Sequence, residues 1–387
     1  MLTAFASCGN DEPGAGLLPD PVPEPEKAHR TVLVYMVSNN NLSRYAMADM
    51  QEMVYGVKAG ALDTGGRLLV YSSLPNETPR LYELKPDGSE ALIKSYTDNA
   101  SSVTVERMRA VIADAKEAAP ADDYGLVLWS HATGWLNDSG VIDDGSSRSA
   151  GESPALISPL SFGADGLPAK KMSITSLARA LEGHHFSFIY FDCCHMATVE
   201  VVYELRHATD RIVASPTELG VEGMPYNRNL ECFFLPKADI DAAAANTFDY
   251  YTTNPSYGCA ITTLDTGALD RLAASTRSIL SDFPYPADYS RIPYFRKVIM
   301  TTGIFDLADY IEARCTDPQR LAEWRRDFNA VVTSFRTTDE VYFLDASRFH
   351  GLGTQIIESP DDASAYDYTA TSWWADVVAP SFTSNPE

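Results

Sequence analysis

Basic side chains are scarce in this sequence. Its 387 residues include 30 Lys and Arg against 53 Asp and Glu, which gives a formal net charge of −23 at pH 7. Proteins that bind nucleic acid through its phosphate backbone need clustered Lys and Arg. The composition therefore argues against nucleic acid as a partner, and it favours basic partners or cationic side chains on a substrate.

Long hydrophobic runs and metal-binding cysteine patterns are also missing. No apolar run reaches the roughly 18 residues that a membrane-spanning helix needs. The six cysteines are too few and too scattered for a disulfide framework, no pair has CxxC spacing, and the seven histidines form no zinc pattern. The sequence thus predicts neither a transmembrane helix nor a zinc centre. Its hydrophobic content of 45% is enough for a packed core, which excludes a disordered chain.

The first thirty residues differ in character from the rest. Residues 1–7 are short and apolar, and the stretch FASC, which ends at Cys8, resembles the tail of a bacterial lipoprotein signal, in which the cysteine is lipidated. The Pro- and Glu-rich segment that follows is typical of a flexible tether. We therefore expect residues 1–30 to be a signal remnant and tether on an exported protein, lipid-anchored at the bacterial cell envelope or surface. An incidental cysteine near a frayed terminus is the alternative.

Apolar runs alternate with helical patterns over residues 31–265. Several runs are apolar on both faces, as strands inside a parallel sheet are. Alternation of strand and helix specifies an α/β sheet that is covered on both faces. The expected strands span residues 31–37, 67–73, 125–130, 186–192, 211–215 and 259–264. The expected helices span residues 43–58, 102–118, 173–182, 196–206 and 240–252.

Two regions depart from this alternation. Residues 136–171 carry many turn signals and no sustained periodicity, which indicates a long loop of functional importance or high mobility. After residue 266 the pattern is mainly helical, with two short strand-like runs near its end. We expect one principal domain over residues 31–265 and an accessory region over residues 266–387 packed on it. The expected elements of that region are helices at 266–282, 304–314 and 319–335, and strands near 341–346 and 352–357.

Two of the expected strands end in residues suited to thiol chemistry. One strand runs into His131, and the other runs into Asp192, Cys193 and Cys194. Ligands and catalytic groups gather beyond the carboxyl ends of strands in open α/β sheets. If the two strands are neighbours, His131 and one cysteine lie close enough for the imidazole to take the proton of the thiol. A helix expected to begin near Met196 would also favour a thiolate at Cys194, although a buried cysteine and a strand-end histidine can each be ordinary core residues.

These residues resemble motifs of the clostripain family of cysteine peptidases. The stretch WSHATGW is similar to the histidine motif of that family, W-S-H-G-x-G-W, and FDCCHMA is similar to its cysteine motif, F-D-A-C-x-M-A. Further similarity lies in TVLVYMVSNNNLS and IVASPTELGVEGMPYN, and more weakly toward the C-terminus. The resemblance implies a caspase-like α/β/α sandwich with a mostly parallel central sheet and a helical C-terminal elaboration. It also implies a cysteine endopeptidase that cleaves polypeptides after Arg or Lys without an organic cofactor.

The resemblance assigns roles to individual residues. Cys194 matches the nucleophile of the family and His131 matches its base. Asp192 matches the acidic floor of the pocket that receives an Arg or Lys side chain, where charge and bidentate geometry select the substrate. A helix N-cap is the alternative role for Asp192. Backbone N–H groups at Ala132 and Cys194 would stabilise the oxyanion.

Four positions depart from the family pattern, one of which is Pro216, near a position that is often acidic in relatives. Ala132 stands where the family normally has Gly, and its methyl group disfavours a positive φ, so the oxyanion site could be altered. Cys193 replaces Ala, and His195 stands where an apolar residue is common. We expect His195 to point into solvent and to have no catalytic role. These departures leave activity uncertain and motivate a second hypothesis, a weak or inactive relative that binds peptides or glycoproteins at the cell surface.

The resemblance further implies self-cleavage at a basic residue between the two motifs. The candidates within residues 136–171 are Arg148, Lys170 and Lys171, and a solvated surface arginine without a processing role is the alternative for Arg148.

Calcium is required by some members of the family. Oxygen ligands could come from Asp138, Asp143 and Asp144, but their spacing matches no defined site. We therefore assign no metal, and we expect contact with a membrane only through a lipidated Cys8.

Overall fold

The structure is a computed structural model that describes residues 27–134, 162–253, 257–295, 304–365 and 368–383. Among these residues, no helix combines the length and the apolar character needed to cross a bilayer. Five residues named above lie outside the described residues: Cys8, Asp138, Asp143, Asp144 and Arg148.

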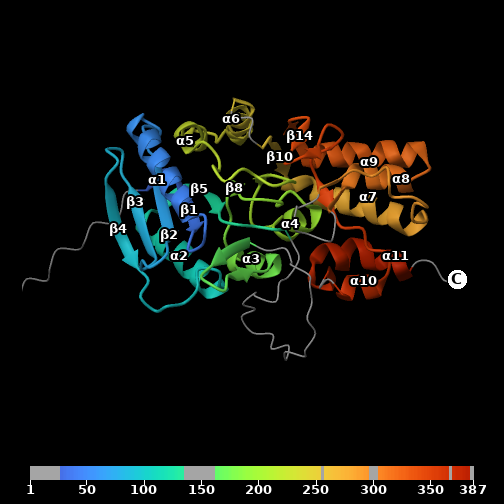
Figure 1. Ribbon diagram of the computed structural model, residues 1–387, viewed down its shortest axis with the longest axis horizontal. Helices are drawn as coiled ribbons and strands as arrows, with labels where there is room; N and C mark the ends of the chain where they lie inside the picture. The colour runs from blue at the N-terminus through green and yellow to red at the C-terminus, as the bar shows by residue number, and fades with distance from the viewer. Residues whose placement is uncertain (1–26, 135–161, 254–256, 296–303, 366–367, 384–387) are drawn as a thin grey trace, which may run out of the picture.

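A nine-stranded sheet forms the centre of the molecule, in the order β13-β10-β9-β8-β5-β1-β2-β3-β4 (Figure 1). Its five middle strands are parallel, and antiparallel strands extend it on both sides. The parallel strands are β1 (Ala28–Val37), β2 (Arg67–Ser73), β5 (Ala121–Trp129), β8 (Phe188–Asp192) and β9 (Arg211–Ala214). The antiparallel strands are β3 (Arg80–Leu84), β4 (Glu90–Ser95), β10 (Ala260–Asp265) and β13 (Val332–Thr337).

Helices cover both faces of this sheet, so its five middle strands are largely buried on both sides. Successive side chains of β1 alternate between two cores: Leu33 and Tyr35 point into one, and Val32 and Val34 point into the other. The predicted α/β/α sandwich is confirmed. One face is covered by α1 (Ser43–Lys58), α5 (Tyr226–Phe234) and α6 (Ile240–Thr253), and the other by α2 (Val105–Ala118), α3 (Ile174–Leu181) and α4 (Val199–Glu204) (Figure 1).

The C-terminal region is mainly helical, as predicted, but it also contributes to the central sheet. The helix expected over residues 319–335 ends at Val331, and the chain continues as β13, which pairs with β10. Val332 and Thr333 are β-branched and favour a strand, and β10 offers them a free edge. The other elements of this region are the helices η1 (Thr266–Ala268), α7 (Leu269–Asp282), α8 (Leu307–Arg314), α9 (Pro318–Val331), α10 (Pro360–Ala365), η2 (Tyr368–Ala370), η3 (Trp374–Val378) and α11 (Ala379–Thr383).

Short strands complete the fold. A hairpin of β6 (Phe162–Asp165) and β7 (Lys170–Met172) ends the segment that was expected to be a loop. Near the C-terminus, β11 (Tyr294–Phe295), β12 (Ile304–Asp306) and β16 (Gly353–Thr354) form a small sheet, and β14 (Glu340–Val341) pairs with β15 (Leu344–Asp345).

Glu200 on α4 connects the C-terminal region to the part of the chain that carries the cysteine motif. The side chain is fully buried. Its Oε1 accepts hydrogen bonds from the Thr354 hydroxyl at 2.9 Å, the Gln355 backbone N–H at 2.9 Å and the Tyr368 hydroxyl at 2.8 Å. Burial raises the pKa of this carboxyl. Three hydrogen-bond donors of the C-terminal region therefore share one acceptor oxygen on α4.

Replacing Glu200 with Ala is expected to lower the free energy of unfolding by about 3 kcal/mol, because it opens a cavity and leaves buried donors without an acceptor. Glu200→Gln is the matched control, because its amide oxygen can accept the same three hydrogen bonds. Its decrease in the free energy of unfolding should be clearly smaller than that of Glu200→Ala. Urea denaturation followed by tryptophan fluorescence measures both values. Equal losses in the two variants would contradict the role assigned to Oε1.

Candidate active site

The histidine and cysteine motifs meet at the carboxyl edge of the sheet. Strands β5 and β8 are parallel neighbours, with Trp129 opposite Asp192. His131 follows two residues after the first of these, and Cys194 follows two residues after the second. Both side chains line one cavity of about 280 Å³. The expectation that these two strands are neighbours is confirmed, and the structure brings His131, Cys194 and Asp192 to a common cavity.

The segment after β1 positions the imidazole. Nε2 of His131 lies 2.7 Å from Oδ1 of Asn41. Because an amide oxygen only accepts, Nε2 is the donor in this contact, and in a neutral ring Nδ1 then has the lone pair. The ring is therefore held in the tautomer whose Nδ1 can receive a proton.

Hydrogen bonds from the β6–β7 hairpin fix the loop that carries Asn41. The Nδ2 atom of Asn40 donates to the backbone oxygen of Ala164 at 2.7 Å, and the Nδ2 atom of Asn39 donates to Oδ1 of Asp165 at 3.0 Å. These bonds attach the loop after β1 to the chain that follows the histidine motif. The orientation of His131 thus depends on a hairpin that sequence analysis treated as loop.

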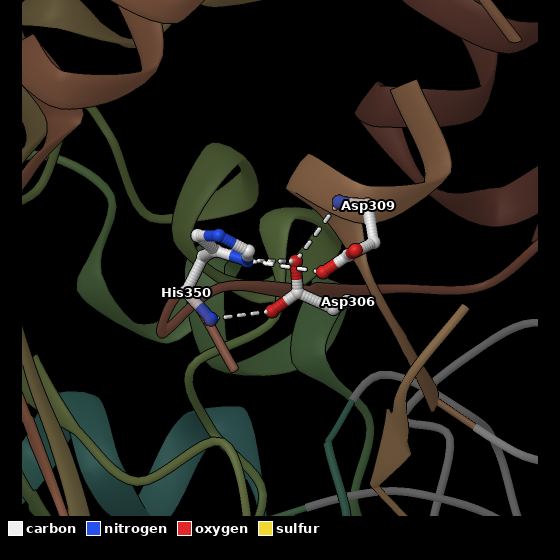
Figure 2. A group of neighbouring side chains, drawn as sticks. All are labelled: Asp306, Asp309 and His350. Carbon is white, nitrogen blue, oxygen red and sulfur yellow. Dashed lines mark hydrogen bonds and ion pairs between the residues drawn. The ribbon is translucent and has the colours of Figure 1, made fainter. Parts of the chain in front are cut away.

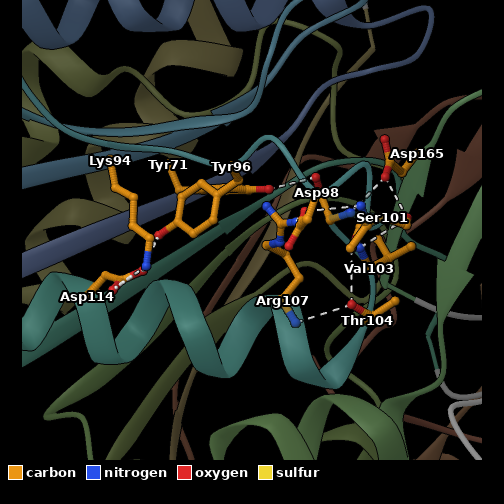
Figure 3. A network of polar contacts seen from close by, with 12 residues as sticks. Tyr71, Lys94, Tyr96, Asp98, Ser101, Val103, Thr104, Arg107, Asp114 and Asp165 are labelled. Carbon is orange, nitrogen blue, oxygen red and sulfur yellow. Dashed lines mark hydrogen bonds and ion pairs between the residues drawn. The ribbon is translucent and has the colours of Figure 1, made fainter.

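Asp165 is itself anchored in a buried polar network (Figure 3). Its Oδ2 accepts from the Ser101 hydroxyl at 2.5 Å and from the Ser102 backbone N–H at 2.7 Å. Ser102 is held in turn by the hydroxyl of Tyr71 at 2.8 Å and by that of Tyr35, which donates to its carbonyl at 2.6 Å. A continuous set of hydrogen bonds therefore runs from β1 and β2 to the hairpin beside His131.

The two adjacent cysteines lie in different environments. Cys194 is partly exposed at the cavity, and its Sγ accepts a hydrogen bond from the Leu219 backbone N–H at 3.4 Å. Cys193 is 4% exposed, and burial together with the nearby Cys194 and Asp192 raises the pKa of its thiol well above the ordinary value. A thiol that stays protonated is a poor nucleophile. Cys194 is therefore the thiol suited to nucleophilic chemistry.

Asp192 places a buried carboxyl group beside the same cavity. The residue is 3% exposed, its Oδ1 accepts from the Met224 backbone N–H at 3.0 Å, and the nearby hydroxyl of Tyr226 lowers its pKa. Burial raises the pKa of this carboxyl. The alternative role as a helix cap is wrong, because the residue that precedes α4 is Thr198. A buried carboxylate without a cationic partner is costly, and a cationic ligand would neutralise it.

Gly223 keeps the approach to this carboxylate open. Its φ of +65° lies in the left-handed region that favours glycine. A Cβ at this position would lie 2.9 Å from Oδ2 of Asp192. Any larger residue would therefore be strained and would cover the acidic group.

Two expectations about the cysteine motif were wrong. His195 does not point into solvent: it is 1% exposed, and its Nδ1 lies 3.3 Å from the carbonyl oxygen of Pro216. The helix expected from Met196 begins at Val199, so Cys194 does not directly precede its first turn. The reason is common to both. Residues 195–197 hydrogen-bond through their backbone to residues 215–217 instead of starting a helix.

The alanine in the histidine motif is accommodated without strain. Ala132 is 3% exposed and pairs with Phe162 in an isolated bridge. It is not among the residues with positive φ, so its methyl group does not conflict with the backbone. Gly134, in the same motif, is the residue that adopts a positive φ of 93°.

The basic residues proposed for self-cleavage lie in different settings. Lys170 and Lys171 belong to β7, which pairs with β6, and Lys171 also lines a second cavity beside His131. A peptide bond inside a paired strand is a poor substrate because a peptidase needs a free extended segment. Arg148 lies outside the described residues.

A separate cluster of ionisable side chains lies beside α8 (Figure 2). Asp306, Asp309 and His350 place ligand-type atoms within 4.8 Å of one another. Oδ1 of Asp306 accepts from the backbone N–H groups of Ala308 and Asp309, and Oδ2 accepts from that of His350. The hydrogen bond to Asp306 also raises the pKa of the His350 ring. Since protein N–H groups already occupy Asp306, we interpret the cluster as a helix cap with an ion pair and assign no metal to it.

Comparison with known proteins agrees with this geometry. The sequence pattern of the Clostripain family matches residues 34–343. The chain belongs to the clostripain family. It is similar to a solved structure described as an inactive zymogen C11 protease from Parabacteroides distasonis, and to one of a secreted C11 cysteine protease from Bacteroides thetaiotaomicron in complex with an irreversible peptide inhibitor. Each is 28% identical with a TM-score of 0.77, over 91% of this chain and 99% of the other. A search of curated proteins finds no match. This member of the clostripain family therefore has the caspase-like fold of C11 cysteine proteases.

The site of this clostripain-family chain contains an acid that the motifs do not reveal. Asp49 on α1 is 3% exposed, and its Oδ2 accepts a hydrogen bond from Nε1 of Trp129 at 2.7 Å. The sequence signal was an Asp on the buried stripe of the helix, between Ala46 and Met53. An acid at a core position of an amphipathic helix is uncommon and points to a specific role.

Proposed function

We propose that this chain is a cysteine endopeptidase that cleaves peptide bonds after Arg or Lys, with Cys194 as nucleophile and His131 as proton carrier. The observation that carries the proposal is the buried carboxyl group of Asp192, which lines the same cavity as the thiol and the imidazole and has no Lys or Arg partner among the described residues. A cationic side chain of the substrate that enters this cavity would form an ion pair with Asp192. The backbone carbonyl group of the same substrate residue would then lie near the sulfur of Cys194.

The proposed reaction has two steps, acylation and hydrolysis. Nδ1 of His131 takes the proton from the Cys194 thiol, and the sulfur attacks the carbonyl carbon of the substrate. Backbone N–H groups of Ala132 and Cys194 stabilise the oxyanion, and the imidazolium gives its proton to the leaving amine. The same ring then takes a proton from water, which attacks the thioester and releases the acid product.

Electrostatics support a basic substrate. The cavity of about 280 Å³ is bordered by Asp192 and also by Glu218. The net charge of −23 adds a long-range attraction for cationic peptides, which raises the rate of encounter at low ionic strength.

Export and processing are also part of the proposal. We propose lipid attachment at Cys8, and one solved relative is described as a secreted protease. Self-cleavage is proposed at Arg148 in preference to Lys170 and Lys171, because the two lysines lie in a paired strand.

The wild-type chain is expected to release a fluorophore from reporter peptides with Arg or Lys before the scissile bond, and to leave a matched norleucine peptide intact. Treatment with iodoacetamide should abolish turnover, because the Cys194 thiol is partly exposed and is the one proposed to react. Mass spectrometry of the treated protein should locate the label on Cys194 and not on buried Cys193. Absence of turnover together with an unlabelled Cys194 would contradict the proposal and favour the peptide-binding hypothesis.

A further inference from the structure

We propose that Asp49 and Asp192 form a proton-sharing pair beneath the substrate cavity, so that a cationic side chain binds with release of a proton. This inference rests on the proposed function, because it concerns how the same site recognises its substrate. It assigns Asp49 a positioning role in substrate selection, exerted through Asp192.

The two carboxyl groups reach the same place from different elements. Oδ2 of Asp49, from α1, and Oδ2 of Asp192, from the end of β8, lie 3.1 Å and 2.9 Å from the position that a Cβ on Gly223 would occupy. Trp129, which stands opposite Asp192 in the sheet, donates its indole N–H to Asp49. One side chain and one glycine therefore hold the two acids around a common point.

Neither acid has a cation to balance it. Within the described part of the chain, no Lys or Arg side chain forms a hydrogen bond or ion pair with Asp49 or Asp192. The donors that face them are neutral: the indole of Trp129 on β5, the backbone N–H of Met224 and the hydroxyl of Tyr226 on α5, which lowers the pKa of Asp192. Such a pair can hold one negative charge far more easily than two.

The surrounding titratable groups add negative charge. Glu52 on α1 raises the pKa of both acids, and Glu222 raises that of Asp49. The nearby cation, Arg228 on α5, acts on Glu52, whose carboxylate also accepts the backbone N–H of Tyr226 at 3.0 Å. The thiol of Cys193 is buried beside Asp192 and stays protonated. The local field therefore favours protonation of the pair in the absence of ligand.

Burial raises the pKa of Asp49 and of Asp192, and repulsion between the two carboxylates raises that of Asp49 further. The empty site consequently keeps a proton on the pair near neutral pH. When a guanidinium or ammonium group enters the cavity, its charge stabilises the doubly ionised pair. The carboxyl O–H bond breaks, the proton passes to solvent, and the ligand keeps its own charge.

Benzamidine binding to the full-length Cys194→Ala chain tests this coupling without turnover. Isothermal titration calorimetry near pH 6, 7 and 8, in buffers of different ionisation enthalpy, gives both the Kd and the number of protons released. We expect the release of nearly one proton for each benzamidine bound. At pH values below the pKa of the pair, the Kd should decrease by up to about tenfold for each unit by which the pH rises. This measurement needs no substitution of either acid.

Asp49→Asn in the same background should flatten the pH profile and reduce the proton release, because its amide keeps the hydrogen bond from Trp129 but cannot share a proton. Glu52→Gln is the matched control: it removes the same charge from the same helix and should keep most of the pH dependence. Thermal unfolding verifies that both variants are folded.

Benzamidine binding that varies less than about twofold across this range, or an Asp49→Asn profile equal to that of the parent, would overturn proton sharing. The absence of any binding would overturn it too. Hydrolysis of Arg reporter peptides by the wild-type chain is judged separately. If the wild-type chain hydrolyses these peptides but benzamidine binding does not depend on pH, the proposed peptidase function stands and proton sharing is refuted.

Discussion

The Cys194→Ala variant is expected to lose hydrolysis of Arg and Lys reporter peptides by at least about 10⁴-fold in kcat/KM, because the substitution removes the sulfur that would form the thioester. The sulfur lies at the cavity that also holds His131, and a backbone N–H donates to it. Steady-state kinetics at several enzyme concentrations measure the loss and exclude a contaminating protease.

Cys193→Ala serves as the control for this experiment. Its thiol is buried and its pKa is raised well above the ordinary value, so it contributes packing and no chemistry. We expect kcat/KM within about threefold of wild type and a loss of about 1 kcal/mol in the free energy of unfolding. Retained activity in Cys194→Ala, or equal loss in both variants, would refute the assignment of the nucleophile.

Asp192→Asn is expected to lower the peptidase activity but to raise the stability of the fold. Cleavage after Arg should fall by about 10³-fold in kcat/KM, because the substrate cation loses its carboxylate partner. The empty variant should nevertheless unfold at a higher temperature than wild type. Burial makes ionisation of the Asp192 carboxyl costly, and the amide removes this cost.

The sign of the pH dependence follows from the raised pKa of Asp192. Above the pKa of the unfolded chain, near 4, the folded state binds more protons than the unfolded state does, so stability decreases as pH rises toward the folded pKa. Thermal unfolding of the wild type should show this decrease, and Asp192→Asn should reduce it. Asp63→Asn, at an exposed surface position, is the control and should change neither activity nor slope. An Asp192→Asn variant that is less stable and cleaves Arg peptides normally would disprove the role of this carboxylate.

The central strands were predictable from sequence because burial on both faces leaves continuous apolar runs. Residues 67–73 and 43–58 were predicted with the bounds that the structure gives them. The hairpin of β3 and β4 was missed, because β4 is largely exposed and only half of its side chains are apolar. Strand β13 was missed because it follows a helix directly, and its partner β10 lies some seventy residues earlier in the chain.

The same distinction applies to the site. Asp192 ends one strand, and His131 and Cys194 follow strands closely, within recognisable motifs, so sequence alone suggested that they would meet. Asp49 could not be placed, since its role depends on how α1 packs against Gly223 and Trp129. His195 was misjudged because the backbone pairing that buries it involves residues about twenty positions away.

The strand order of the sheet determines what would follow if a peptide bond between Gly134 and Phe162 were cleaved. Such a cut separates β5 from β8 in the chain, yet these strands remain joined by their ladder, and Gly163 still donates to the carbonyl of His131 at 2.9 Å. The imidazole would then belong to one polypeptide and the sulfur to another. A single scission would yield a two-chain enzyme whose halves are held together by the sheet that built the site.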